Sequence, residues 1–221
     1  MLVMIKVMVV DDHELVRTGI TRILNDAPGV RVVGEAASGE EALVLVRQKM
    51  PDVLLMDVSM PGIGGLEATR KLLQSNAELK IIVVSVHSEE PFPSRMLQAG
   101  ASGYLTKGCA VDEIIAAIKA VSAGDRYIGA DVAQKLALKM TPGGEISPFD
   151  ALSPREMQVM LMLTQGQRLQ AISDKLSLSP KTVSTYRHRL YEKLGVNSDV
   201  DLARLAMNYG IVDAAPEVSS V

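Results

Sequence analysis

Short apolar runs alternate with longer amphipathic stretches through the first 123 residues of the chain. The runs are apolar at nearly every position, which is typical of parallel strands because helices cover both faces of a parallel sheet. The amphipathic stretches place apolar residues three or four positions apart, the spacing of one helix face. The pattern predicts strands at residues 5–10, 30–36, 53–56, 81–84 and 103–105, and helices near residues 14–25, 39–48, 65–75, 91–99 and 111–123.

Five successive strand-helix pairs predict an α/β domain with a doubly wound, five-stranded parallel sheet, because each parallel connection takes a right-handed crossover. This domain is expected to cover residues 1–124. Residues 125–149 contain a helical stretch near residues 132–140 and then TPGGEISPFD, in which Pro and Gly have a turn-forming frequency. Such a composition buries little apolar area, so we expect a linker with one short helix.

The periodicity is purely helical after residue 150, and serines that suit helix starts recur along the chain. Ser153 precedes Pro and Glu in the pattern of a capping box, Ser179 also precedes Pro, and Ser198 stands three residues before an Asp. Serine side chains at such positions accept hydrogen bonds from the first free N–H groups of a helix. An all-α domain of four helices is therefore expected over residues 150–214, with a flexible tail at residues 215–221.

Polar residues follow four of the predicted strands at or near their ends. Asp11 and Asp12 follow the first strand, Asp57 the third, Ser85 the fourth, and Lys107 stands just past the fifth. Because the carboxyl ends of parallel strands meet at one edge of a sheet, these side chains are expected to surround one crevice. Three carboxylates make a hard oxygen site that favours Mg²⁺, and the ion would hold a phosphoryl donor.

Each of these residue types has a task in phosphoryl transfer. With Mg²⁺ bound, one carboxylate can attack phosphorus and form an acyl phosphate. Lys107 would neutralise a second phosphoryl oxygen, and the Ser85 hydroxyl could hydrogen-bond a third. A phosphoryl group adds roughly two negative charges to a crevice that already holds three carboxylates, so its arrival can drive a conformational switch. His13 and His87 are interpreted as solvated loop or helix-start residues.

The second domain is basic. Residues 151–195 carry seven basic and three acidic side chains, a net charge of +4, whereas residues 1–150 carry fifteen basic and nineteen acidic ones, a net charge of −4. Opposite signs suggest two different partners. Residues 171–194 have the spacing of a helix-turn-helix. Its second helix either contacts DNA, with hydroxyls and His at base edges and cations on phosphates, or is simply solvated. The polar face has Lys181, Ser184, Thr185 and His188, flanked by Arg187, Arg189 and Lys193.

Composition narrows the class of protein. The chain has 221 residues, of which 48% are hydrophobic and 22% charged, values typical of globular domains. The single Cys109 excludes an internal disulfide, and no Cys/His cluster has zinc spacing, which fits a reducing cytoplasm. No apolar stretch reaches the roughly 18 residues needed to span a bilayer. The Asp pair at positions 11 and 12 interrupts the N-terminal apolar run too early for a signal peptide, so neither secretion nor membrane insertion is expected.

Four motifs of the first domain together resemble the receiver domain of two-component response regulators. They are VVDDHELVR, LLMDVSMPGIGG, the serine that ends IIVVS, and the lysine of GYLTKG. The resemblance covers residues 4 to about 123 and implies a flavodoxin-like fold in which Asp57 accepts phosphate from the histidine of a sensor kinase. The chain departs from the family at Gly108, because most members have proline after the lysine.

The same resemblance implies roles for further residues of the pocket. Asp12 and Asp57 would bind Mg²⁺ directly, together with the Ser59 backbone carbonyl, and Asp11 would act largely through water. Ser85 and Tyr104 would form a switch pair whose side chains re-orient on phosphorylation.

The segments LSPREMQVM and SPKTVSTYRHRLYEKLGV resemble the C-terminal DNA-binding domain of NarL/LuxR-type regulators. The chain departs from that family at Gln158 and Ala171, where glutamates are common. PGIGGLEATRKLL and SPFDALS add a resemblance to the GacA/UvrY group, which implies a GacS/BarA-like hybrid sensor histidine kinase and promoters of small regulatory RNAs. The DNA-binding residues expected by position are Lys181, Thr182, Ser184, Thr185, Arg187, His188, Arg189 and Lys193.

These observations predict a cytoplasmic, phosphorylation-dependent transcriptional regulator that binds double-stranded DNA. A single short helix reads few base pairs, so a homodimer on an inverted repeat is expected on activation. The last helix, with Leu202, Leu205, Ala206 and Met207, either supplies the dimer surface or is half-buried within its own domain.

Two alternatives use the same motifs. The first is an aspartyl-phosphate phosphatase or phosphotransferase, but such enzymes commonly have a second acid where this chain has Ser59, so at most slow self-phosphorylation and self-dephosphorylation are expected. The second is a signalling adaptor whose helical domain binds a protein.

Overall fold

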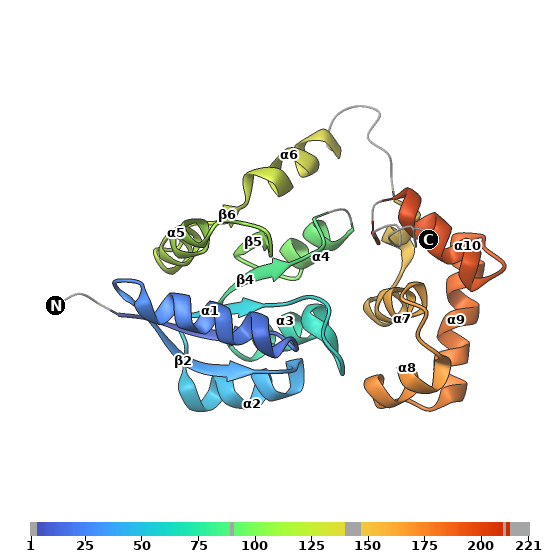
Figure 1. Cartoon of the computed structure of the whole chain (residues 1–221), viewed down its shortest axis with the longest axis horizontal. Coiled ribbons are helices and arrows are strands. Elements are labelled where there is room, and N and C mark those ends of the chain that lie inside the picture. The colour runs from blue at the N-terminus through green and yellow to red at the C-terminus, as the bar shows by residue number, and fades with distance from the viewer. Residues whose placement is uncertain (1–3, 89–90, 140–146, 210, 213–221) are drawn as a thin grey trace, which may run out of the picture. The chain divides into compact units, whose positions relative to one another are not determined.

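The computed structural model describes residues 4–88, 91–139, 147–209 and 211–212. The chain divides into two compact units, Met1–Glu145 and Ile146–Val221. In Figure 1 the first unit runs from blue to yellow-green and the second from yellow to red. Within the described ranges, no helix combines the length and apolar character needed to cross a bilayer.

The first unit alternates strands and helices along a parallel sheet with strand order β2-β1-β3-β4-β5-β6 (Figure 1). The prediction of five strands was wrong by one, because a two-residue strand after α5 adds a sixth. The elements are β1 (Ile5–Val10), α1 (Glu14–Asp26), β2 (Val30–Ala36), α2 (Gly39–Lys49), β3 (Val53–Met56), α3 (Gly64–Ser75), β4 (Lys80–Ser85), α4 (Phe92–Gln98), β5 (Gly103–Thr106), α5 (Val111–Ser122), β6 (Tyr127–Ile128) and α6 (Ala130–Lys139).

Two apolar clusters bury the two faces of the sheet. Alternate residues of a strand point to opposite faces, so Val7 and Val9 of β1 join one cluster and Met8 and Val10 join the other. The first cluster is completed by side chains of α1 and α5, and the second by side chains of α2 and α3. Each fully buried aliphatic side chain stabilises the fold by about 1.5–3 kcal/mol. Burial on both faces explains why the central strand β3 is apolar at every position.

The segment after α5 differs from the exposed connection expected over residues 125–149. Tyr127 donates its N–H to the Ser102 carbonyl at 3.1 Å, and Gly129 donates to the Tyr104 carbonyl at 2.9 Å, so β6 extends the sheet. Helix α6 then contacts β5 and α4. Two residues are too few to show a strand period, which is why β6 was missed. The end of the predicted helix, Met140, and all of TPGGEI (residues 141–146) lie outside the described residues.

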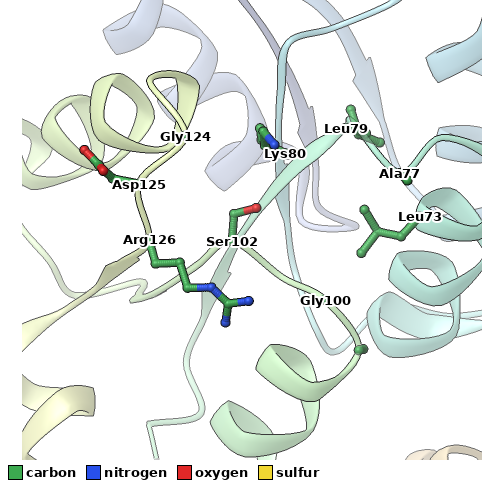
Figure 2. A pocket seen from close by; sticks show the side chains of 10 residues that line it. Leu73, Ala77, Leu79, Lys80, Gly100, Ser102, Gly124, Asp125 and Arg126 are labelled. Carbon is green, nitrogen blue, oxygen red and sulfur yellow. The ribbon is translucent and has the colours of Figure 1, made fainter.

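A polar hollow of about 400 Å³ lies at the amino ends of β4, β5 and β6 (Figure 2). Lys80 begins β4 and Ser102 directly precedes β5, while Arg126 directly precedes β6. In Figure 2 the Arg126 guanidinium points along the hollow toward Gly100, and the carboxylate of Asp125 points away from it. The hollow is therefore at the sheet edge opposite the ends that carry the predicted carboxylates.

The second unit is helical throughout its described residues. Serine caps begin three of its helices as predicted: Ser153 forms a capping box, and Ser179 and Ser198 accept N–H groups of the first turn. The predicted tail at residues 215–221 lies outside the described residues. The elements are the 3₁₀-helix η1 (Pro148–Ala151) and the helices α7 (Pro154–Thr164), α8 (Leu169–Leu176), α9 (Pro180–Leu194) and α10 (Asp199–Asn208).

Helix α10 is part of the core of the second unit. Leu202 and Ala206 of α10 and Val183 and Leu190 of α9 are all fully buried. The alternative in which the last helix is half-buried within its own domain is thus the one that the structure supports for Leu202. Val200 and the other exposed positions of α10 lie away from the helix face that carries Leu202 and Ala206.

Candidate acidic pocket and DNA-facing helix

The strand ends bring Asp11, Asp57 and Lys107 into direct contact. Lys107 Nζ lies 2.6 Å from Asp11 Oδ2 and 3.1 Å from Asp57 Oδ2. The two carboxylates come from adjacent strands, since β1 pairs with β3, and both residues are only 3% exposed. Lys107 is positioned through its backbone N–H, which donates to the Ser85 carbonyl at 2.8 Å. A cation therefore lies between two buried carboxylates at the carboxyl edge of the sheet.

Burial and charge oppose each other at this contact. Burial raises the pKa of the Asp57 carboxyl, the Lys107 ammonium lowers it, and the Asp11 carboxylate raises it again, so the net shift is upward. Burial alone would lower the pKa of Lys107, but the neighbouring carboxylates of Asp57 and Asp11 outweigh burial and raise it. Lys107 therefore remains an ammonium at neutral pH, whereas the ionised form of Asp57 costs free energy in the folded state.

The pocket has the donor set of a hard cation. Ligand atoms of Asp11, Asp12, His13 and Asp57 all lie within 4.8 Å of one another. Asp12 Oδ1 is buried yet accepts no hydrogen bond from the described residues, although His13 Nδ1 lies 3.1 Å away. Carboxylate oxygens suit Mg²⁺, and a cation would satisfy this oxygen. The residues present thus fit the ion that the sequence predicts.

His87 joins the predicted switch residues to the loop after Asp57. Its N–H donates to Ser85 Oγ at 3.2 Å, its carbonyl accepts from the Tyr104 hydroxyl, and its Nε2 is 2.8 Å from Ser59 Oγ. The imidazole also stacks on Phe92 with ring centroids 4.3 Å apart. The interpretation of His87 as a solvated loop residue was wrong. The only sequence signal for a position in this network was that His87 stands two residues after the end of a strand.

The turn between α8 and α9 is fixed by its own residues. Ser177 ends α8 in the left-handed region, with φ of 52°. The Leu178 N–H donates to the Ser173 carbonyl at 3.0 Å, and the buried Ser173 hydroxyl donates to the Leu178 carbonyl at 2.6 Å. Ser179 then caps α9 by accepting the Thr182 N–H at 3.1 Å. These bonds set the angle between the helices of a helix-turn-helix.

Helix α9 exposes most of the predicted DNA-facing residues along one stripe. Thr182 is half-buried, and its hydroxyl is 2.8 Å from Ser179 Oγ at the helix cap. His188 Nε2 lies 3.4 Å from Glu192 Oε1, one turn further along. A stripe of exposed hydroxyls, imidazole and cations presents the donors and acceptors that read base edges. The exposed predicted residues are Lys181, Ser184, Thr185, His188, Arg189 and Lys193.

Two predicted phosphate contacts are instead ion-paired inside the second unit. Arg187 makes a two-point pair with Asp199. Lys193 Nζ lies 2.7 Å from Glu156 Oε2 and 3.1 Å from the Ala151 carbonyl. Glu156 is 3% exposed, so Lys193 compensates a buried charge. The sequence could not show these pairs, because the partners are 12 and 37 residues away.

An acidic, lysine-bridged pocket on a parallel sheet, followed by a basic helix-turn-helix, defines a two-domain signalling protein with a receiver and a DNA-binding output. The family described as "Response regulator receiver domain" matches residues 7–119, and the family described as "Bacterial regulatory proteins, luxR family" matches residues 150–206.

Similar proteins cover both domains. The response regulator GacA of Pseudomonas aeruginosa is 60% identical over 213 residues, which cover 96% of this chain and 100% of that protein. The response regulator UvrY of Escherichia coli is 54% identical, with coverages of 96% and 97%. A solved complex of the response regulator RcsB with DNA is 28% identical, covers 91% of this chain and 97% of that chain, and has a TM-score of 0.59.

The chain therefore belongs to the response regulators that join a receiver domain to a LuxR-type DNA-binding domain. Its identity to GacA and UvrY, 60% and 54% over nearly the whole chain, confirms the predicted resemblance to that group.

Proposed function

We propose that Asp57 accepts a phosphoryl group from a sensor histidine kinase and thereby controls DNA binding by the second domain. The contact of Lys107 Nζ with both Asp11 and Asp57 carries the proposal, because it aims a fixed cation at the oxygens where charge develops during phosphoryl transfer. Burial raises the pKa of Asp57, and Asp57 lies at the end of the central strand β3.

The crevice between β1 and β3 is the expected ligand site of a doubly wound, flavodoxin-like sheet. In such sheets ligands bind where the strand order reverses, and the observed order β2-β1-β3 supports this assignment. Asp12, Asp57 and the Ser59 backbone carbonyl would hold Mg²⁺, with Asp11 acting largely through water. When bound, the ion would neutralise phosphate oxygens and orient the donor.

Ser85 and Tyr104 would report the state of Asp57. Both side chains are fully buried and both contact the backbone of His87, so a movement of Ser85 toward a phosphoryl oxygen would disturb the same loop that binds the Tyr104 hydroxyl. This arrangement is a local electrostatic change coupled to a packed element, which is how phosphorylation switches act.

The output we propose is a homodimer bound to an inverted repeat in promoter DNA in the cytoplasm. The exposed stripe of α9 would enter the major groove, with Lys181, Ser184, Thr185 and His188 toward the bases and Arg189 toward a phosphate. The similarity to GacA and UvrY supports a GacS/BarA-like kinase as the donor. We infer no enzymatic turnover beyond slow self-phosphorylation and self-dephosphorylation.

The acceptor is tested by incubating the full chain with acetyl phosphate and Mg²⁺ and measuring phosphate incorporation by intact mass. Asp57→Asn should abolish incorporation, and the exposed Asp125→Asn should leave it unchanged. DNA selected from a random library, with and without the phosphoryl donor, should contain an inverted repeat and be bound more tightly by the phosphorylated chain. Incorporation by Asp57→Asn at the native level would exclude Asp57 as acceptor.

A further inference from the structure

Three side chains connect the DNA-facing helix to the start of α10. The Asp199 carboxylate accepts from Arg187 Nε at 2.9 Å and from Arg187 Nη2 at 2.7 Å. It also accepts from the Tyr191 hydroxyl at 2.7 Å. The guanidinium lies over the Tyr191 ring, 5.1 Å from its centroid. Two-point pairs of this kind fix both the orientation and the charge balance of an arginine.

Arg187 and Arg189 lie on opposite flanks of the exposed stripe of α9. Each residue advances about 100° around a helix, so positions two apart are separated by about 160°. A helix with its side chains nearly fills the major groove, and its two flanks therefore face the two phosphate backbones. Arg189 is exposed on one flank, whereas Arg187 on the other is directed to Asp199. The two flanks thus offer unequal positive charge to DNA.

We propose that Asp199 is a specificity-determining residue that withholds Arg187 from the DNA phosphates. Phosphate contacts supply affinity for any sequence and carry no sequence information, so withholding one cation lowers non-specific binding more than it lowers base reading. The proposal rests on α9 being the DNA-contacting helix, as proposed above.

The local structure favours the closed pair over a phosphate contact. The Asp199 carboxylate lies in the first turn of α10, where the helix dipole stabilises negative charge. Its hydrogen bonds with Arg187 raise the pKa of the guanidinium, so the ionised pair is mutually stabilised. A phosphate that replaced Asp199 would leave this carboxylate and the Tyr191 hydroxyl without the hydrogen bonds they make in the closed arrangement.

The test measures binding of the full chain to a labelled duplex of arbitrary sequence, about three helical turns long, across salt concentrations. Asp199→Ala should bind this duplex more tightly, with a log–log salt slope steeper by about 0.9 per subunit. That slope makes the gain in affinity over the native chain roughly 3.5-fold larger at about 50 mM salt than at 200 mM. Arg187→Ala should keep the native slope, and Arg187→Ala combined with Asp199→Ala should return to it.

Asp201→Asn is the matched control, because it removes the same charge from the same helix turn but contacts Ser198 and Arg204 instead of Arg187. A slope change by Asp201→Asn equal to that of Asp199→Ala would overturn the proposal, since it would show a general charge effect. A reduced salt slope in Arg187→Ala would also overturn the proposal. Because this variant keeps Asp199, it still tests the proposal if Asp199→Ala unfolds α10. Weaker binding by Arg189→Ala alone would support α9 as the DNA-facing helix. Unchanged binding by every α9 variant would instead contradict the proposed function itself.

Discussion

Lys107 Nζ lies 3.1 Å from Asp57 Oδ2, and this contact compensates a carboxylate that is almost fully buried. Lys107 shares its charge with Asp11, so one cation serves two buried anions. The pocket is therefore short of positive charge until a metal ion arrives. This imbalance has a measurable consequence for the stability of the receiver.

Asp57→Asn should stabilise the receiver at neutral pH in the absence of Mg²⁺. The pKa of Asp57 is raised above its ordinary 3.8 in the folded state, so its ionised form destabilises the fold as pH rises from 3.8 through the folded pKa. The gain should be about 1–3 kcal/mol at pH 7 and vanish below pH 3.8. Urea titrations followed by receiver methyl resonances measure it, and Mg²⁺ should shrink the difference. An equal gain in the free energy of unfolding at pH 7 and below pH 3.8 would contradict this account.

His87→Ala should loosen the loop that follows Asp57. The change removes the Nε2 bond to Ser59 and the stacking on Phe92 while keeping the backbone bonds of residue 87. Amide hydrogen exchange of residues 58–63 should accelerate by roughly tenfold, which corresponds to about 1.4 kcal/mol for one lost hydrogen bond and its packing. His188→Ala, in the second unit, should leave these amides unchanged. Unchanged exchange in His87→Ala would show that the imidazole does not hold the loop.

Leu202→Ala and Val200→Asp should separate core packing from surface contacts in α10. Leu202 is fully buried, so its truncation should lower the free energy of unfolding of the second unit by about 2–5 kcal/mol. Val200 is 78% exposed, and Val200→Asp should leave that free energy within about 0.5 kcal/mol. Thermal unfolding measures both free energies. Sedimentation of the phosphorylated chain reports whether each variant still dimerises. A strongly destabilised Val200→Asp would contradict the exposed position.

Lys193→Met should destabilise the second unit, and more so at neutral than at acid pH. Burial raises the pKa of the Glu156 carboxyl, but the hydrogen bonds from Lys193 and Ser153 outweigh it, so the net pKa is lowered from 4.5. Stability from this pair is present above 4.5 and lost as pH falls through the lowered pKa. The loss in Lys193→Met should be about 1–3 kcal/mol at pH 7. Unaltered stability with weaker DNA binding would instead make Lys193 a phosphate contact.

The order of elements and the pocket could be predicted because local signals were strong. Continuous apolar runs located five strands within a residue or two, and three serine caps located helix starts. The strand β6 could not be predicted, because two residues show no period and their pairing with β5 joins segments that are distant in sequence. The short helix expected after residue 125 is present as α6, but its packing on β5 and α4 could not be predicted, because those elements are distant in sequence.

The sequence by itself determined the chemistry of this protein: carboxylates and a lysine at strand ends, and a basic helix after a serine cap. Those features are local, because strand ends share an edge and helix faces follow a fixed period. Only the tertiary structure decided which charges are available, by pairing Arg187 with Asp199 and Lys193 with Glu156. Such pairs join residues that are distant in sequence, and their strength depends on burial, which exists only once the chain has folded.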